Sequence, residues 1–66
     1  MIPLAQFRPD FRDWILAQSD DARLALSNEW QRLQTDPRVK QGHRNADHAR
    51  RLFLMQYAAL ILGWKG

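Results

Sequence analysis

The chain contains no cysteine, which excludes disulfide bridges and thiolate metal sites. It has only three glycines and three prolines in 66 residues, and no internal repeat or low-complexity tract. No apolar run reaches the roughly 20 residues of a membrane-spanning helix, and residues 1–6 lack the basic and long apolar regions of a signal peptide. We therefore expect one cytoplasmic domain, residues 1–66, with no membrane segment.

What the chain does have is a globular composition, with 45% hydrophobic and 26% charged residues and a net charge of +3. A domain of this size buries only about 60% of the surface of its unfolded chain. Without disulfides, its expected support is dense packing of its three Trp and three Phe residues, or oligomerisation. Eight of the ten basic residues are arginine and alanine is frequent, which is typical of a GC-rich bacterial or phage genome.

The most apolar segment is 52–62, in which Gln56 is the only strongly polar residue. Asn45 is a suitable N-cap, Asp47 follows in the first turn, and Gly63 suits the left-handed residue after a helix. These signals predict a helix over 46–62. At 100° per residue, its expected core stripe consists of Ala46, Ala49, Phe53, Tyr57, Leu60 and Trp64.

Two further helices are predicted before it. Asp10 as N-cap predicts a short helix over 11–18, and Ser19 as N-cap predicts a longer amphipathic helix over 20–34. The two could also be continuous through Ser19. The core stripe of the longer helix consists of Ala22, Leu26, Trp30 and Leu33.

The remaining segments are short. Pro3 and Pro9 predict that 1–9 is an extended strap across the helices, and Asp36 with Pro37 predicts one helical turn over 37–41, anchored by Val39. The fold class expected is all-α: a small three-helix bundle with a short helix, a longer amphipathic helix, a very apolar C-terminal helix and an extended N-terminal strap.

The C-terminal helix is apolar on more than one side. A helix that is apolar all round needs to be covered all round, and so short a chain offers little to cover it. This predicts an oligomer or partner interface formed by Leu52, Met55, Ala59, Leu62 and Trp64. Two alternatives remain open: the strap covers this side, and Trp64 closes the bottom of the core.

Positive charge is concentrated between positions 38 and 51. The basic residues there, against the single acid Asp47, are Arg38, Lys40, Arg44, Arg50 and Arg51. Arginines beside a helix N-terminus suit phosphate, so one interpretation is backbone binding to nucleic acid. The others are an acidic partner surface and a solvated basic turn.

Catalytic and metal-binding patterns are weak. The hydroxyls of Ser19, Ser27 and Thr35 have capping or solvent-facing explanations, and His43 with Asp47 offers two metal ligands without a third. We expect no enzyme, no cofactor and no small-molecule substrate. The sequence favours a small non-enzymatic protein-binding module, adaptor-like or inhibitor-like, that binds another protein or itself as a homodimer, with nucleic-acid backbone binding as the alternative.

Overall fold

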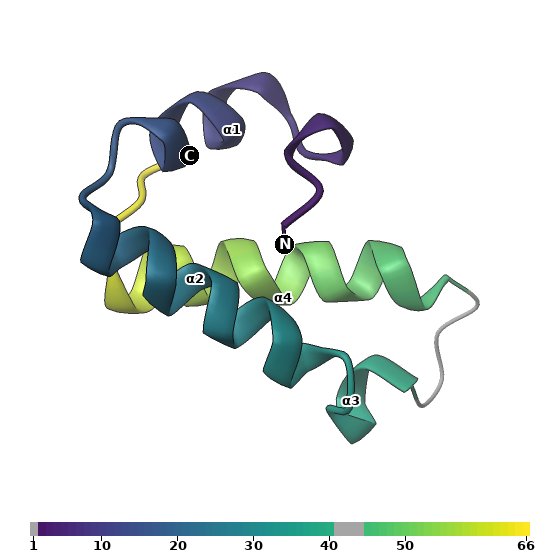
Figure 1. Cartoon of the computed structure of the whole chain (residues 1–66). Coiled ribbons are helices and arrows are strands. Elements are labelled where there is room, and N and C mark those ends of the chain that lie inside the picture. The colour runs from purple at the N-terminus through teal and green to yellow at the C-terminus, as the bar shows by residue number, and fades with distance from the viewer. Residues whose placement is uncertain (1, 41–44) are drawn as a thin grey trace.

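Two long helices that run in opposite directions form the body of the protein, and a shorter helix lies across one side of the pair (Figure 1). The computed structural model describes residues 2–40 and 45–66. Its helical elements in chain order are a 3₁₀ turn, η1 (Leu4–Gln6), and the α-helices α1 (Pro9–Leu16), α2 (Asp20–Leu33), α3 (Pro37–Lys40) and α4 (Ala46–Ile61). No strand occurs in those two ranges. The predicted all-α class, with three main helices, is confirmed.

Both N-caps predicted for the longer helices are confirmed. Ser19 Oγ accepts a hydrogen bond from the Ala22 N–H at 3.2 Å, and Asn45 Oδ1 accepts one from the His48 N–H at 3.0 Å. Ser19 has an extended backbone, so α1 and α2 are separate helices and not one continuous helix.

The first helix begins and ends two residues earlier than the predicted 11–18. Pro9 occupies its first position, where the fixed φ of proline suits a helix start and no N–H is needed. The predicted N-cap role of Asp10 is therefore wrong. Asp10 lies in the first turn and accepts two hydrogen bonds from the side chain of Arg8, the residue at the cap position.

The core is one cluster to which every helix contributes. The buried apolar side chains are Phe7, Phe11, Ile15, Leu26, Trp30, Leu33, Val39, Ala49, Leu54 and Ala58. The stripe predicted for α2 is confirmed at its three large residues, all in this set. Val39 anchors α3 as expected, although Gln41, the last residue predicted for that turn, lies outside the described residues.

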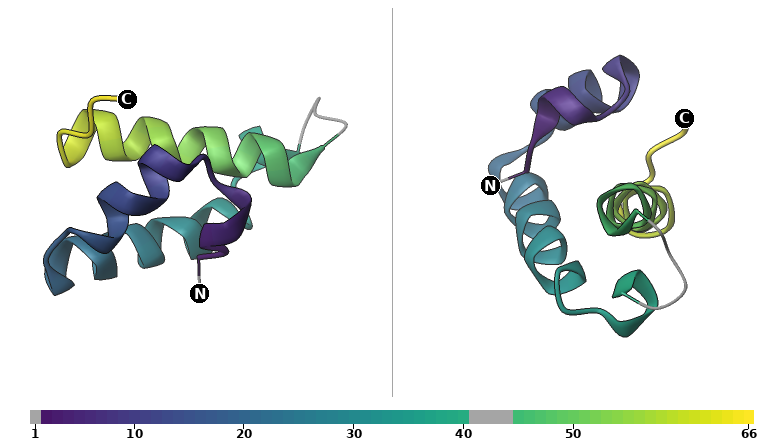
Figure 2. Two further views of the ribbon diagram at one scale, coloured as in Figure 1. Left: turned by 90° about the horizontal axis from the view of Figure 1, so that it is seen from above. Right: turned by 90° about the vertical axis from the view of Figure 1, so that its right-hand side faces the viewer.

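The predicted core stripe of α4 is wrong in part. Leu54 and Ala58 are fully buried, whereas Phe53 and Tyr57 are half-buried and Leu60 is 74% exposed. Ala49 is buried as predicted and Ala46 is exposed. From residue 53 onward, the buried line is displaced by one residue from the predicted line, or about 100° around the helix. Both lines are apolar, and the core formed on the side where α2, α1 and the N-terminal segment lie (Figure 2).

The C-terminal tail closes the end of this core. Gly63, with φ +80°, turns the chain after α4, as expected of a left-handed residue at that position. The ring of Trp64 then meets that of Phe11 edge-on, with centroids 4.7 Å apart, and lies 6.5 Å from Trp14. Trp64 thus packs against aromatic rings of α1, as expected if it closes the end of the core.

The N-terminal segment, residues 2–8, packs against the core as the strap was expected to do, although η1 interrupts its extended backbone. Phe7 is buried, and Ile2 and Leu4 are half-buried. The Arg51 guanidinium donates a hydrogen bond to Gln6 Oε1 at 3.2 Å. The segment is thereby joined to α4 on the side that carries Met55.

Candidate functional site

A groove that combines apolar and basic side chains lies between the N-terminal segment and α4. Its volume is about 320 Å³. The residues that line it, called here the basic groove, are Gln6, Phe7, Arg8, His48, Arg51, Leu52 and Met55. Phe7 is buried and Met55 half-buried, whereas Leu52 is 53% exposed. The apolar surface that the groove offers to solvent therefore comes mainly from Leu52 and Met55.

The charge in the basic groove is incompletely neutralised. Among the described residues, Arg51 forms no ion pair; its hydrogen-bond partner is the neutral amide of Gln6. Arg8 does pair with Asp10, at 2.6 Å between Nη2 and Oδ2, and this hydrogen-bonded contact lowers the pKa of the Asp10 carboxyl. Both partners are about half exposed, so the pair is strongly solvated. The basic groove therefore combines a positive charge with apolar lining residues.

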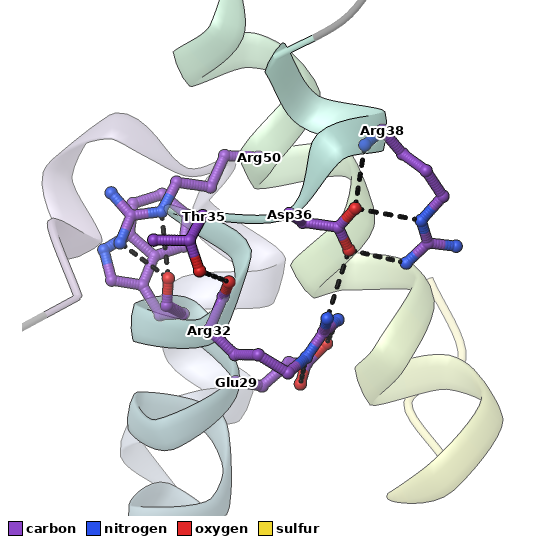
Figure 3. A network of polar contacts seen from close by, with 7 residues as sticks. Glu29, Arg32, Thr35, Asp36, Arg38 and Arg50 are labelled. Atoms are coloured by element: carbon purple, nitrogen blue, oxygen red, sulfur yellow. Dashed lines mark hydrogen bonds and ion pairs between the residues drawn. The ribbon is translucent and has the colours of Figure 1, made fainter.

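Two of the other predicted basic residues are used inside the fold (Figure 3). The Arg38 guanidinium donates to both oxygens of Asp36, at 3.2 and 2.9 Å, and lies 4.8 Å from the centroid of the Phe53 ring. The Arg50 guanidinium donates two hydrogen bonds to the Trp30 carbonyl oxygen and stacks on the Trp30 ring. Neither arginine faces the basic groove.

The five basic residues predicted as one cluster are thus not brought together where the structure describes them. Arg38, Arg50 and Arg51 contact three different parts of the fold. Arg44 lies outside the described residues, as does the side chain of Lys40. Among the cluster side chains that the structure describes, Arg51 alone lines the basic groove.

Asp36 is the centre of an ion-pair network at the turn between α2 and α3. Besides Arg38, it accepts a hydrogen bond from Arg32 at 3.1 Å, and Arg32 also pairs with Glu29 at 2.6 Å. The Arg38 hydrogen bonds are the main cause that holds the pKa of the Asp36 carboxyl well below its usual range, and Arg32 adds to them. Two acids and two arginines neutralise each other here, so this turn has little capacity left to bind an anion.

A second groove lies on another side of α4, toward α2 and α3. Its volume is about 250 Å³. The residues that line it, called here the apolar groove, are Glu29, Leu33, Arg38, Phe53, Gln56, Tyr57, Leu60 and Ile61. Leu60 and Ile61 are 74% and 65% exposed, which makes them two of the most exposed large apolar side chains described. A third, wider groove of about 490 Å³ includes Ile2, whose neighbour Met1 lies outside the described residues.

The predicted interface residues are divided between surface and core. Leu52 and Met55 line the basic groove, and Ala59 is exposed. Leu62 and Trp64 are half-buried and pack against the core cluster. Sequence reasoning missed Phe7 and Arg8, because only the fold brings the N-terminal segment beside α4. It also missed Leu60, because the helical pattern assigned that residue to the core.

No family model matches the chain, and neither a curated protein nor a solved structure is significantly similar to it. The site must therefore be judged from its own chemistry.

Within residues 2–40 and 45–66, no three side chains of the types that bind metals lie close enough to hold an ion together. The candidate ligand His43 lies outside these residues. Two of the hydroxyls considered at the sequence level act at helix ends: Ser19 caps α2, and Thr35 Oγ1 donates to the Arg32 carbonyl oxygen at 3.2 Å. In the described part of the chain, no helix is long and apolar enough to cross a membrane.

Proposed function

We propose that the protein is a small non-enzymatic protein-binding module, and that its basic groove receives an acidic segment of a partner that carries an apolar anchor residue. The observation that supports this proposal is the juxtaposition of Arg51, a charge without an acidic partner among the described residues, with the half-exposed side chain of Leu52. Interfaces are typically built from an apolar centre with charged groups at its rim.

Charge complementarity favours an acidic partner. The groove carries Arg8, Arg51 and His48, and its lining includes no acid. Carboxylates beside the anchor residue would be attracted to this rim and would orient the bound segment. A helical segment with apolar residues three or four positions apart and acids beside them has this arrangement.

Binding of nucleic acid is less well supported by the geometry. Backbone binding needs several basic side chains along one surface. Arg38 and Arg50 are held by Asp36 and by the Trp30 carbonyl oxygen, respectively. Binding to DNA is therefore measured beside binding to peptides in the experiment below.

The test is fluorescence anisotropy with labelled probes at low salt. The first probe is a short amphipathic peptide with leucines on one face and glutamates beside them; the second replaces each glutamate by lysine. The third and fourth are a short DNA duplex and a DNA single strand. We expect the protein to bind the acidic peptide and to bind the lysine peptide much more weakly.

Variants make the test specific to the groove. Leu52 is about half exposed, so binding would bury the remaining half of a leucine side chain, a contribution of about 1 kcal/mol. Leu52→Ala should therefore weaken binding of the acidic peptide about fivefold. Arg51→Glu should reverse the preference between the acidic and lysine peptides. The matched control is Leu24→Ala, since Leu24 is 60% exposed on α2, away from the basic groove.

Equal binding of the acidic and lysine peptides, or an equal loss in Leu24→Ala and Leu52→Ala, would refute the docking site. Tight binding of DNA, with no binding of either peptide, would favour the nucleic-acid alternative instead.

A further inference from the structure

The side of α4 that the sequence pattern assigned to the core is apolar and partly exposed. Ala49, Phe53, Tyr57 and Leu60 are spaced by four, four and three residues, as in helices that pair along a seam. Their burial decreases along the helix: Ala49 is buried, Phe53 and Tyr57 are half-buried, and Leu60 is 74% exposed. Phe53 and Tyr57 are thus partly covered by the rest of the described chain, whereas Leu60, at the end of the stripe, is largely uncovered.

The exposed end of the stripe combines protruding and recessed apolar groups. Leu60 and Ile61 are largely exposed and lie at the edge of the apolar groove, whose inner wall includes Leu33, Phe53 and Tyr57. Exposed apolar side chains beside an apolar groove allow two identical surfaces to fit each other, with the side chains of each in the groove of the other. In a twofold contact, each subunit offers the same patch and receives the same patch.

The charges around the two grooves differ in how they would affect contact with a second copy of the chain. The chain carries a net charge of +3, so two copies repel each other in general. The charged residues at the rim of the apolar groove are already paired within the chain: Glu29 with Arg32 at 2.6 Å, and Arg38 with Asp36 at 2.9 Å. This rim is close to neutral, whereas the rim of the basic groove would repel a second copy.

We propose that the apolar groove pairs with the same groove of a second copy of this chain, with the two α4 helices antiparallel about a twofold axis. Leu60 of each subunit would then lie against Phe53 of the partner subunit. The axis would pass near Gln56, which is midway between these two positions and exposed.

The expected contact is small, because it involves only the second half of α4 and one edge of α2 and α3. Small protein interfaces are typically weak and reversible. We expect a monomer–dimer equilibrium that depends on protein concentration. Dimerisation should be strengthened by salt, because salt screens the repulsion between like net charges while apolar contacts persist.

Sedimentation velocity over a range of concentrations tests the proposal. The wild-type protein should change from monomer to dimer mass, and Leu60→Glu should remain a monomer throughout. Leu24→Glu is the matched control, because it makes the same charge change at a leucine that is 60% exposed elsewhere. Circular dichroism establishes that both variants are folded. A wild-type protein that stays monomeric at every concentration and salt, or a control that loses dimer as Leu60→Glu does, would overturn the proposal.

Cross-linking tests the arrangement separately. The chain lacks cysteine, so Gln56→Cys introduces a single thiol beside the expected axis. A short bifunctional maleimide should join two copies of this variant, and should join Gln31→Cys, on α2, far less. Equal cross-linking of the two variants would exclude the antiparallel contact. Failure here leaves the peptide-binding result unaffected, because that experiment uses the other groove and is read at concentrations below dimerisation.

Discussion

Replacement of Arg50 should destabilise the fold more than replacement of an arginine in an exposed ion pair, such as Arg23. Its Nε and Nη2 donate to the Trp30 carbonyl oxygen at 2.9 and 2.6 Å, and its guanidinium carbon lies 3.8 Å from the centroid of the Trp30 ring. That carbonyl belongs to the last turn of α2, where carbonyls lack partners within the helix. Arg50 thus caps α2 and fixes α4 to it.

The magnitude follows from these contacts. A hydrogen bond to a charged group contributes about 1.5–3 kcal/mol, and a partly buried cation–π contact contributes roughly 0.5–2 kcal/mol. Both hydrogen bonds share one oxygen, so they are counted once, and Arg50→Ala should cost about 2–5 kcal/mol. A domain of this length has roughly 3–10 kcal/mol in total. Arg50→Lys keeps the charge but loses the planar two-donor geometry, so its stability should lie between that of the wild type and that of Arg50→Ala.

Urea unfolding, followed by tryptophan fluorescence and by circular dichroism, measures this effect. Arg23→Ala is the control, because Arg23 forms an exposed ion pair with Asp20 that should contribute less than about 1 kcal/mol. A double-mutant cycle with Trp30→Leu removes the aromatic ring but keeps the main-chain carbonyl, and so separates stacking from hydrogen bonding. If Arg50→Ala lay within about 0.5 kcal/mol of the wild type, the bond to the carbonyl would not stabilise the fold as we infer.

The other stability predictions concern two helix N-caps, one glycine and one buried carboxylate. Ser19→Ala and Asn45→Ala each remove the N-cap of a long helix and should each cost about 1 kcal/mol in the same unfolding experiment, whereas Ser19→Gly should cost only a few tenths. Gly63→Ala should cost about 1 kcal/mol from backbone strain alone, because φ is +80° and a Cβ would meet no atom within 4 Å. The folded state lowers the pKa of the Asp36 carboxyl, so the ionised group stabilises the fold. This stabilisation is fully present above the unfolded pKa of about 4, and it is lost as the pH falls toward the lower pKa of the folded state. Asp36→Asn should therefore be less stable than the wild type at pH 7 and lose less stability on acidification, in urea titrations repeated across that pH range; a parallel acid dependence in both proteins would exclude this role.

Local signals in the sequence determined the helices well. A polar N-cap such as Ser19 or Asn45 acts on the N–H groups two or three residues ahead, so its effect can be read without knowing the fold. Gly63 was predictable for the same reason, since its backbone conformation depends on its own missing side chain. The start of α1 was misjudged because two adjacent residues, Pro9 and Asp10, both carry a start signal.

Which side of α4 forms the core could not be read from its own sequence. The line through Leu54 and Ala58 and the line through Phe53 and Leu60 are both apolar. The choice depends on where the rest of the chain packs, which is a tertiary property. Ala58 is fully buried although its side chain is small, which its own sequence neighbourhood does not indicate.

The described arginines of the predicted basic cluster lie apart for a related reason. A run of arginines in sequence carries no information about what each guanidinium can reach in the fold. Arg38 and Arg50 found an acid and a carbonyl oxygen as internal partners, whereas Arg51 reached only the neutral side chain of Gln6. Long arginine side chains reach partners on other elements, so adjacent residues such as Arg50 and Arg51 end in different surroundings.

The two grooves on α4 should act independently. Arg51 and Leu60 are nine residues apart, or about 13 Å along the helix axis, and they line different grooves. Substitutions separated by more than about 7–10 Å without shared partners usually have additive effects. Leu60→Glu should therefore leave the affinity for the acidic peptide unchanged within about 0.5 kcal/mol. Arg51→Glu should leave the dimer intact, or strengthen it slightly, because it reduces the net charge of each copy. Affinity measured by anisotropy and mass measured by sedimentation on the same two variants would test this; if each variant impaired both activities, the two sites would be one surface.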